Sequence, residues 1–316
     1  MKSNHNLKTF KLLKNVNQSG GDVQAALLYL FFIGIIGLIA YIFYQYKSVY
    51  IYGTDGNYVY KYNMILGEKY GKWTKITESL ASMDLSKTIL GLQIIGDTIY
   101  ATNGQVILSH ELHSGIKIGN WKQISTAGNI KQFQIIGDTI YICNQVQVFK
   151  TGLKDGKNGK WVKISPGTIK NFQIIGNIIY GCNGSYVYKY TIGSPEKDGW
   201  TQITEAAVIS FQIVGDNIYG NNGNHIYIHG LNSGIKGGNW KQLTGGNIKI
   251  TEFYILGKYM YALIENRIYR HILDVDLNAN NWIAMANKDI SISTFHVAEN
   301  DKILGIQLKK RESQQY

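Results

Sequence analysis

The chain has 316 residues, and 32 Lys and Arg against 21 Asp and Glu give it a formal net charge of +11. With 45% hydrophobic residues and only two cysteines, it can bury a core of its own, which excludes a fold that depends on a disulfide framework. The positive charge suits anionic lipid, nucleic acid or an acidic protein surface. Abundant Lys, Ile, Asn and Tyr with few Arg and Pro are also typical of AT-rich genomes, such as those of large DNA viruses and several microbial groups.

The N-terminal segment differs from the rest of the sequence. Residues 1–24 form a polar, basic tail, and residues 25–45 begin with 20 uncharged residues, AALLYLFFIGIIGLIAYIFY. As a helix, this run is about 30 Å long, which matches the hydrocarbon core of a bilayer. We therefore expect a transmembrane helix at 25–45. A cleaved signal peptide is the alternative, and it is disfavoured by the long polar segment before the apolar run and by the lack of an A-x-A-like site after it.

Flanking charge predicts the orientation of this helix. Four lysines precede the apolar run, and Lys47 follows it. The positive-inside rule then predicts a single-pass membrane protein with a cytoplasmic N-terminus and the remaining domain on the opposite side. Because residues 45–48 reach at most about 14 Å when extended, we expect that domain to lie close to the bilayer. The four preceding lysines are Lys2, Lys8, Lys11 and Lys14.

Six tryptophans mark one repeated unit along the rest of the chain. Their spacings are 48, 40, 39, 40 and 42 residues, and each lies in a pattern close to Gly-x-Trp-x-x-Ile. A period near 40 with several short strands per unit is typical of a β-propeller. We predict an all-β, six-bladed β-propeller of four-stranded blades at 46–308, preceded by the transmembrane helix and followed by a tail at 309–316. The tryptophans, expected to pack between blades rather than to stack on a ligand sugar, are Trp73, Trp121, Trp161, Trp200, Trp240 and Trp282.

Two sets of turns recur within the units. Asn-Gly and Asp-Gly pairs separate β-rich runs, as at Asn183-Gly184, and predict type I′ hairpin turns whose central residues both have positive φ. A second turn with Gly and a polar residue, such as Gly176-Asn177, precedes each of them. Two hairpins and the Trp-bearing segment give four strands per blade. The Asn183-Gly184-Ser185 sequon belongs to the turn column, so we expect no requirement for a glycan there.

The first unit begins at Val49 and has no first strand in front of it. The C-terminal run Thr294–Ala298 resembles the first strands of the other units, so we expect it to complete blade one and remove the exposed sheet edges. Residues 302–306 also resemble a second strand. A partial seventh blade therefore remains an alternative to six blades with an extra terminal strand.

One run, from Trp161 to Asn183, resembles the tectonin repeat. That family reads Trp-x-x-Ile, a small residue with Gly, an apolar strand, and then an aromatic before an Ile-Tyr strand. In this chain the second aromatic is a tyrosine, and the outer loops are longer. The resemblance covers residues 49–308 and implies a propeller, with sugar binding or lipopolysaccharide binding as the activities known in the family. The tyrosines are Tyr100, Tyr141, Tyr180 and Tyr219.

No combination of residues predicts catalysis, a cofactor or a metal. Six-bladed sialidases need an arginine triad, but all three arginines here follow residue 266 and no Asp-box is present. The histidine pairs His110/His113 and His225/His229 raise the question of a metal, yet three histidines share one repeat column with Tyr62, Thr151 and Tyr190, which favours a structural role. Cys143 and Cys182 occupy equivalent positions in consecutive blades and are expected to be buried thiols rather than a disulfide.

Two loops three blades apart are nearly identical. The sequence HSGIKIGNWKQI begins at His113, and NSGIKGGNWKQL begins at Asn232. Because loops usually diverge, this similarity predicts two equivalent contact sites with lysines at their tips. Recent duplication without selection is the alternative. The candidate partner-binding residues are Ser114, Gly115, Ile116, Lys117, Ser233, Gly234, Ile235 and Lys236.

Two functions fit these features. The first is a non-enzymatic, membrane-anchored adaptor whose partners are the lipid bilayer and other proteins. In a viral setting, this would be a minor structural protein of the virion membrane that contacts capsid or membrane components. The alternative is a tectonin-like lectin that binds glycans at a membrane surface. Nucleic acid is disfavoured as a partner because no RNA-binding motif is present and the fold accounts for the aromatic columns.

Overall fold

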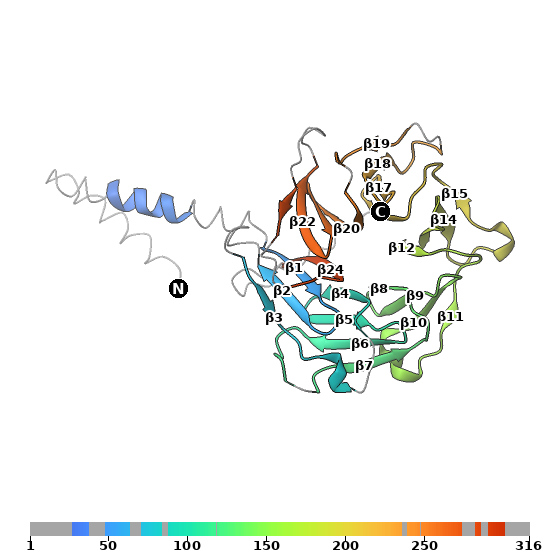
Figure 1. The fold of residues 1–316 in the computed structure, drawn as a ribbon, viewed down its shortest axis with the longest axis horizontal. Coiled ribbons are helices and arrows are strands. Elements are labelled where there is room, and N and C mark those ends of the chain that lie inside the picture. The colour runs from blue at the N-terminus through green and yellow to red at the C-terminus, as the bar shows by residue number, and fades with distance from the viewer. Residues whose placement is uncertain are drawn as a thin grey trace, which may run out of the picture. The chain divides into compact units, whose positions relative to one another are not determined.

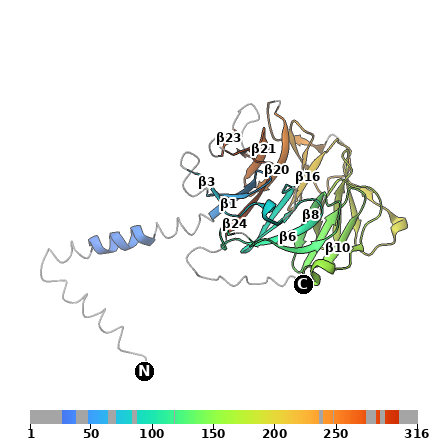
Figure 2. The same ribbon diagram turned by 60° about the horizontal axis from the view of Figure 1, so that its bottom comes forward.

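The structure is a computed structural model of the chain. It describes residues 27–37, 48–63, 71–83, 88–117, 119–235, 239–246, 248–273, 282–285 and 290–300. The chain divides into two compact units, of which one comprises Met1–Ser48 with Asn300–Tyr316 and the other comprises Val49–Glu299. The second unit is all-β and forms six four-stranded sheets arranged as a propeller (Figures 1 and 2).

The terminal unit contains one described helical segment, residues 27–37. No helix in the described part of the chain combines the length and the apolar character that crossing a bilayer requires. The predicted transmembrane segment is longer than this helix, since residues 25–26 and 38–45 lie outside the described residues. The predicted tails at 1–24 and 309–316 also lie outside them.

Each blade of the propeller is a sheet of four hydrogen-bonded strands, ordered here from the central channel to the rim. Blade one consists of β24 (Thr294–Asn300), β1 (Ser48–Thr54), β2 (Val59–Asn63) and β3 (Trp73–Lys75). Blade two consists of β4 (Gly91–Ile95), β5 (Thr98–Thr102), β6 (Val106–Glu111) and β7 (Lys122–Thr126). Blade three consists of β8 (Gln132–Ile136), β9 (Thr139–Cys143), β10 (Val148–Gly152) and β11 (Val162–Lys163). Blade four consists of β12 (Asn171–Ile175), β13 (Ile178–Cys182), β14 (Val187–Thr191) and β15 (Thr201–Gln202). Blade five consists of β16 (Ser210–Val214), β17 (Asn217–Asn221), β18 (Ile226–Gly230) and β19 (Lys241–Gln242). Blade six consists of β20 (Ile250–Leu256), β21 (Tyr259–Ile264), β22 (Arg267–Ile272) and β23 (Ile283–Ala284). The described parts of the connections include the short 3-10 helices η2 (Leu80–Met83), η3 (Leu153–Asn158) and η4 (Glu196–Asp198).

The hydrophobic core lies between the blades. Burial alternates from residue to residue along the inner strands. The buried side chains form six clusters, and each cluster is shared by two neighbouring blades. In one of them, Ile99 and Leu108 of blade two pack with Val59 and Leu80 of blade one. Because each fully buried aliphatic side chain contributes about 1.5–3 kcal/mol, every blade depends on both of its neighbours, and the ring must close to complete the core.

The C-terminal strand closes the ring, which confirms the sequence prediction. β24 occupies the innermost place in the sheet of blade one, next to β1. The Ser293 amide donates a hydrogen bond to the Thr54 carbonyl at 2.7 Å, as the Lys170 amide does to the Cys182 carbonyl in blade four. The alternative of a partial seventh blade depends on residues 302–306, which lie outside the described residues.

Glutamines on the innermost strands join consecutive blades around the channel. The Gln93 side chain accepts a hydrogen bond from the Ile135 amide (2.8 Å) and donates one to the Ile135 carbonyl (3.1 Å). Gln173 and Gln212 make the same pair of bonds to the blades that follow them. These bonds satisfy backbone groups that the sheets leave unpaired and fix the height of one blade against the next.

The tryptophans bridge neighbouring blades. The indole nitrogen of Trp161 donates to the Thr126 carbonyl of the preceding blade at 2.8 Å, and that of Trp200 donates to the Pro166 carbonyl. In blade four the Trp200 ring lies over Gly181, where a Cβ would come within 3.1 Å of it. This Cβ would come closer still to Ile169 Cγ2, at 2.8 Å, so a side chain at that glycine would force this packing to shift.

The Asn-Gly and Asp-Gly turns are present, but the predicted type I′ conformation is wrong for them. Among the described residues with positive φ are Gly104 and Gly184 but neither of the asparagines before them. The asparagine side chain instead forms the turn: Asn183 Oδ1 accepts hydrogen bonds from the Ser185 and Tyr186 amides, both at 2.9 Å. This local bonding keeps the asparagine at negative φ and leaves one glycine to adopt positive φ.

Candidate protein-interaction site

The two candidate loops occupy equivalent places in blades two and five. Ser114–Lys117 lies between β6 and β7, and Ser233–Ile235 lies between β18 and β19. Lys236 falls outside the described residues. The structure does not bring the two loops together, since blades two and five lie on opposite sides of the six-bladed ring.

Both loops begin with the same tight turn. In blade two the Ser114 amide and hydroxyl donate to the Glu111 carbonyl at 3.2 and 2.8 Å. In blade five Ser233 donates in the same way to the Gly230 carbonyl at 3.1 and 2.8 Å. The next residue is a glycine with φ of 76° in blade two and 83° in blade five. Only a glycine adopts this backbone without strain, which explains the Ser-Gly pair in both copies.

An asparagine before each tryptophan holds the loop from behind. Asn120 Nδ2 donates to the Ser114 and Gly115 carbonyls, both at 3.2 Å. Asn239 Nδ2 donates to the Ser233 carbonyl at 2.7 Å. The residue after the glycine then points outward, and the exposed fractions of Ile116 and Ile235 are 60% and 45%. The shared sequence thus encodes a backbone clamp that presents an isoleucine to solvent.

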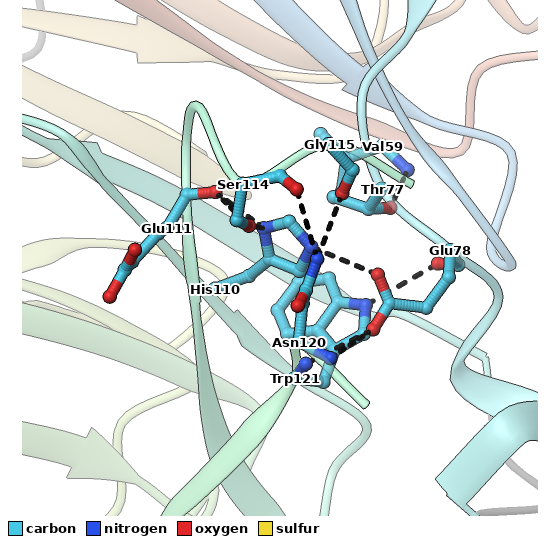
Figure 3. A network of polar contacts seen from close by, with 9 residues as sticks. All are labelled: Val59, Thr77, Glu78, His110, Glu111, Ser114, Gly115, Asn120 and Trp121. Atoms are coloured by element: carbon cyan, nitrogen blue, oxygen red, sulfur yellow. Dashed lines mark hydrogen bonds and ion pairs between the residues drawn. The ribbon is translucent and has the colours of Figure 1, made fainter. Parts of the chain in front are cut away.

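A buried polar network supports the loop of blade two (Figure 3). The carboxylate of Glu78, in the connection between blades one and two, lies 2.9 Å from His110 Nε2 and accepts hydrogen bonds from the Asn120 and Trp121 amides at 2.8 and 3.1 Å. The exposed fractions of Glu78 and His110 are 5% and 1%. No sequence motif points to Glu78, although the 48-residue spacing between Trp73 and Trp121 indicates extra residues at this point.

The histidines in the repeat column pack against the tryptophans. The ring centroids of His110 and Trp121 are 4.9 Å apart, and the corresponding pairs in blades five and six lie at 4.8 and 5.0 Å. Burial lowers the pKa of His271 in blade six. Within the described ranges, no group of three or more His, Cys, Asp or Glu side chains is placed to hold a metal ion. His113 and His225 each lie apart from these rings, beside Asp97 and Tyr227 respectively.

Both cysteines are buried and free, as the sequence predicts. Each thiol donates to a carbonyl of the following blade, Cys143 to Ile169 at 3.3 Å and Cys182 to Val208 at 2.8 Å. Burial raises the pKa of both thiols. They act as small hydrogen-bonding residues at the blade interfaces.

A pocket of about 240 Å³ lies beside the loop of blade two. Its volume is below the roughly 300–1,000 Å³ that small-molecule sites usually provide. A second hollow of about 590 Å³ lies around the turn Asn103–Gln105. The smaller pocket is lined by Thr98, Tyr100, Ser109, His110, Glu111, Asn120, Lys122, Ile124 and Leu153.

Two half-buried titratable groups lie where blade six meets blade one. Glu252 of β20 accepts hydrogen bonds from the Phe295 amide and the Thr294 hydroxyl, both at 3.2 Å. Burial raises the pKa of Glu252 to about 7, although these hydrogen bonds oppose the rise. Burial lowers the pKa of His296, which packs against Tyr254 at 5.5 Å, to about 4. Both groups lie on the strands that close the ring.

Comparison with known proteins identifies the fold and no family. No family model and no curated protein matches the sequence. A chain in the crystal structure of a nidogen/laminin complex is similar, with a TM-score of 0.57, 12% identity, and coverage of 79% of this chain and 98% of that one. PorZ of Porphyromonas gingivalis has a TM-score of 0.47 and 9% identity, with coverage of 79% and 37%. Hsv2p of Kluyveromyces lactis has a TM-score of 0.41 and 10% identity, with coverage of 73% of each chain.

Proposed function

We propose that this protein is a non-enzymatic adaptor, anchored to a membrane by its N-terminal apolar segment, that docks another protein on the rim loops of its propeller. One observation carries the proposal. Two loops three blades apart have the same hydrogen-bonded clamp and expose the same side chain, Ile116 in one and Ile235 in the other. In the viral setting that the composition fits, the adaptor would join the internal membrane to the capsid layer.

The chemistry of the loop indicates the kind of partner. An exposed isoleucine is followed by a lysine, Lys117 in blade two, whose side chain is also exposed. This pair suits an apolar depression bordered by carboxylates on the partner. Because the loop backbone is already ordered by its asparagine, binding loses less conformational entropy than it would for a free loop. The 240 Å³ pocket beside the loop can take a side chain in return.

The membrane anchor is the second part of the proposal. Its support is the uncharged run from residue 25 to residue 44 and the four lysines before it. In sealed vesicles whose cytoplasmic face points outward, added protease should remove the N-terminal tail and leave the propeller intact. Digestion of the propeller in intact vesicles would contradict the orientation, and release of the protein by alkaline carbonate would contradict the anchor.

Substitution of the two exposed isoleucines tests the docking role. Partners of the full-length chain are first identified by cross-linking and mass spectrometry in native membranes or particles, and affinity is then measured with the purified partner. Ile116→Ser and Ile235→Ser should each weaken binding by about tenfold, which corresponds to about 1.4 kcal/mol, and the double variant should weaken it further. Lys157→Glu on the equivalent connection of blade three is the control and should have no effect.

The lectin alternative predicts a different result. Selective, salt-insensitive binding to one sugar on a glycan array, with no protein retained in the cross-linking experiment, would contradict the adaptor proposal. Under that outcome, the isoleucine variants would bind the sugar as well as the wild type does. Protein binding through Lys117 should instead weaken as salt is added, since exposed charges are screened.

A further inference from the structure

We infer that Glu78 is a positioning residue that fixes the blade-two loop in its binding conformation, and that this loop is the primary contact while its copy in blade five is secondary. The inference rests on the proposed function for the identity of the contact, but the positioning role can be measured without a partner. Glu78 lies in the connection between blades one and two, and its carboxylate contacts the Asn120 and Trp121 amides at the end of the loop (Figure 3).

The Glu78 carboxylate is fully engaged. One oxygen accepts the Asn120 and Trp121 amides at 2.8 and 3.1 Å, and the other lies 2.9 Å from His110 Nε2. The Glu78 carbonyl also accepts the Trp121 indole N–H at 3.4 Å. Asn120 and Trp121 are the last two residues of the loop before β7. Their hydrogen bonds to Glu78 therefore fix the end of the loop, and the hydrogen bond from Ser114 to the Glu111 carbonyl fixes its start.

The other nitrogen of His110 completes the network. Nδ1 lies 2.8 Å from the Glu111 carbonyl, and Nε2 faces the Glu78 carboxylate. Both neighbours are acceptors, and satisfying both requires a proton on each ring nitrogen or a protonated carboxyl. In either state the imidazole contacts the start of the loop directly and its end through Glu78, and the ring packs at an angle against Trp121.

An insertion explains why Glu78 reaches this place. The connection from Thr77 to Ile89 spans 89 − 77 = 12 positions, whereas the equivalent one from Thr204 to Val208 spans 208 − 204 = 4. The eight extra residues account for the difference between the 48-residue and 40-residue tryptophan spacings. They include η2, Leu80–Met83, whose first residue is buried between the blades. The longer connection allows the Glu78 side chain to reach the Asn120 and Trp121 amides of the loop.

Blade five lacks this support. Glu205, which takes the place of Glu78 after the shared Ile-Thr pair, is exposed. Among the described contacts, no hydrogen bond or ion pair joins it to His229, Asn239 or Trp240. The indole nitrogen of Trp240 is buried without a hydrogen-bond partner there. The two loops therefore share a sequence and a clamp but differ in what holds them from below.

Hydrogen exchange on the full-length protein in detergent tests the positioning role directly. Glu78→Ala should accelerate amide exchange in residues 112–121 at least tenfold, because it frees the Asn120 and Trp121 amides and the His110 ring. Glu78→Gln keeps an accepting oxygen and should change exchange by only about threefold. Glu205→Ala, the matched control, should leave residues 231–240 within twofold of the wild type.

Photo-cross-linking in native membranes tests which loop is the primary contact. Benzoylphenylalanine at position 116 should give at least five times the cross-linked yield of the same group at position 235, and Glu78→Ala should remove that excess. The positioning role would be overturned if amide exchange in Glu78→Ala stayed within twofold of the wild type. If the alanine variant does not fold, the same result in Glu78→Gln would overturn it. Accelerated exchange with equal yields from positions 116 and 235 would instead overturn the primary contact, while the proposed function would fail if neither position gave a product.

Discussion

Replacing Glu252 with glutamine should stabilise the protein in alkaline solution and change its stability little in acid. Glu252 closes the ring by accepting hydrogen bonds from the Phe295 amide and the Thr294 hydroxyl. In blade three, Gln132 does the same with an amide oxygen, which accepts the Phe172 amide at 2.7 Å. A neutral amide thus suffices at this position, and the carboxylate in blade six adds a charge that burial disfavours.

The pKa values set the size and the direction of the effect. Burial raises the pKa of Glu252 from 4.5 to about 7 in the folded protein. The folded state therefore holds a proton that the unfolded state releases between these values, so this stability is fully present below pH 4.5 and is lost as the pH rises through 7. One pKa unit corresponds to about 1.4 kcal/mol, which bounds the loss at about 3 kcal/mol, and partial access of water lowers our expectation to about 1–3 kcal/mol.

Thermal unfolding of the full-length protein at pH 5 and pH 8.5 measures this difference. For a domain of this size about 1 kcal/mol shifts the Tm by about 2–4 °C, so we expect Glu252→Gln to raise the Tm by about 2–12 °C at pH 8.5. The reverse change, Gln132→Glu, should lower it at pH 8.5. The stability that His296 contributes to the fold is lost as the pH falls from 6.5 towards 4. This loss is the same in the wild type and in both variants, so it cancels when their Tm values are compared. An equal increase in Tm at both pH values would refute the reasoning.

Three further outcomes follow from the contacts. Phe295→Ala, which opens a cavity where β24 closes the ring, should cost about 3–4 kcal/mol in denaturant unfolding; an unchanged midpoint would contradict the closure. Asn183→Ala should cost about 1 kcal/mol because it removes two turn hydrogen bonds, whereas Ser185→Ala should cost under about 0.5 kcal/mol. Cys143 and Cys182 should react with a thiol reagent only after unfolding, and rapid labelling of the native protein would argue against their burial.

The repeat made the fold predictable from the sequence. A tryptophan every 40 residues or so, together with paired turns, determined the number of blades and of strands in each. The closing strand was also predictable, because blade one lacks a first strand and Thr294–Ala298 carries the matching pattern. These features are visible in one sequence because each blade repeats the same interface, so that six copies of one pattern report on one structural requirement.

The turn conformation was not predictable from the Asn-Gly pairs alone. The pattern favours type I′, but it does not show that the asparagine side chain will accept the next two amides and hold its own φ negative. In blade six, by contrast, Glu265 and Asn266 both have positive φ, although the sequence there contains no Asn-Gly pair. The side-chain hydrogen bond competes with the backbone preference, and its outcome depends on the blade that packs behind the turn.

The support of the candidate site was hidden for a different reason. The duplicated loop sequence identifies the clamp in both copies, but the carboxylate beneath the blade-two loop comes from another blade, 42 residues before Asn120. Both Glu78 and Glu205 follow an Ile-Thr pair, and only the lengths of the following connections distinguish them. Sequence similarity therefore predicts two equivalent sites, whereas packing makes them different.

Differences between the blades are the most informative positions in this protein. Where a column is filled alike in several blades, as by the channel glutamines, the fold accounts for the residue. Where one blade departs from its column, the fold alone does not require the change. The insertion after Thr77 is such a departure and lies in the connection that contacts the blade-two loop, whereas Glu252 occupies a column whose residue differs in every blade and places a carboxyl at the seam. A longer connection adds little to the entropy lost on folding, so the fold tolerates this insertion, and Glu78 at its start holds the Asn120 and Trp121 amides of the blade-two loop.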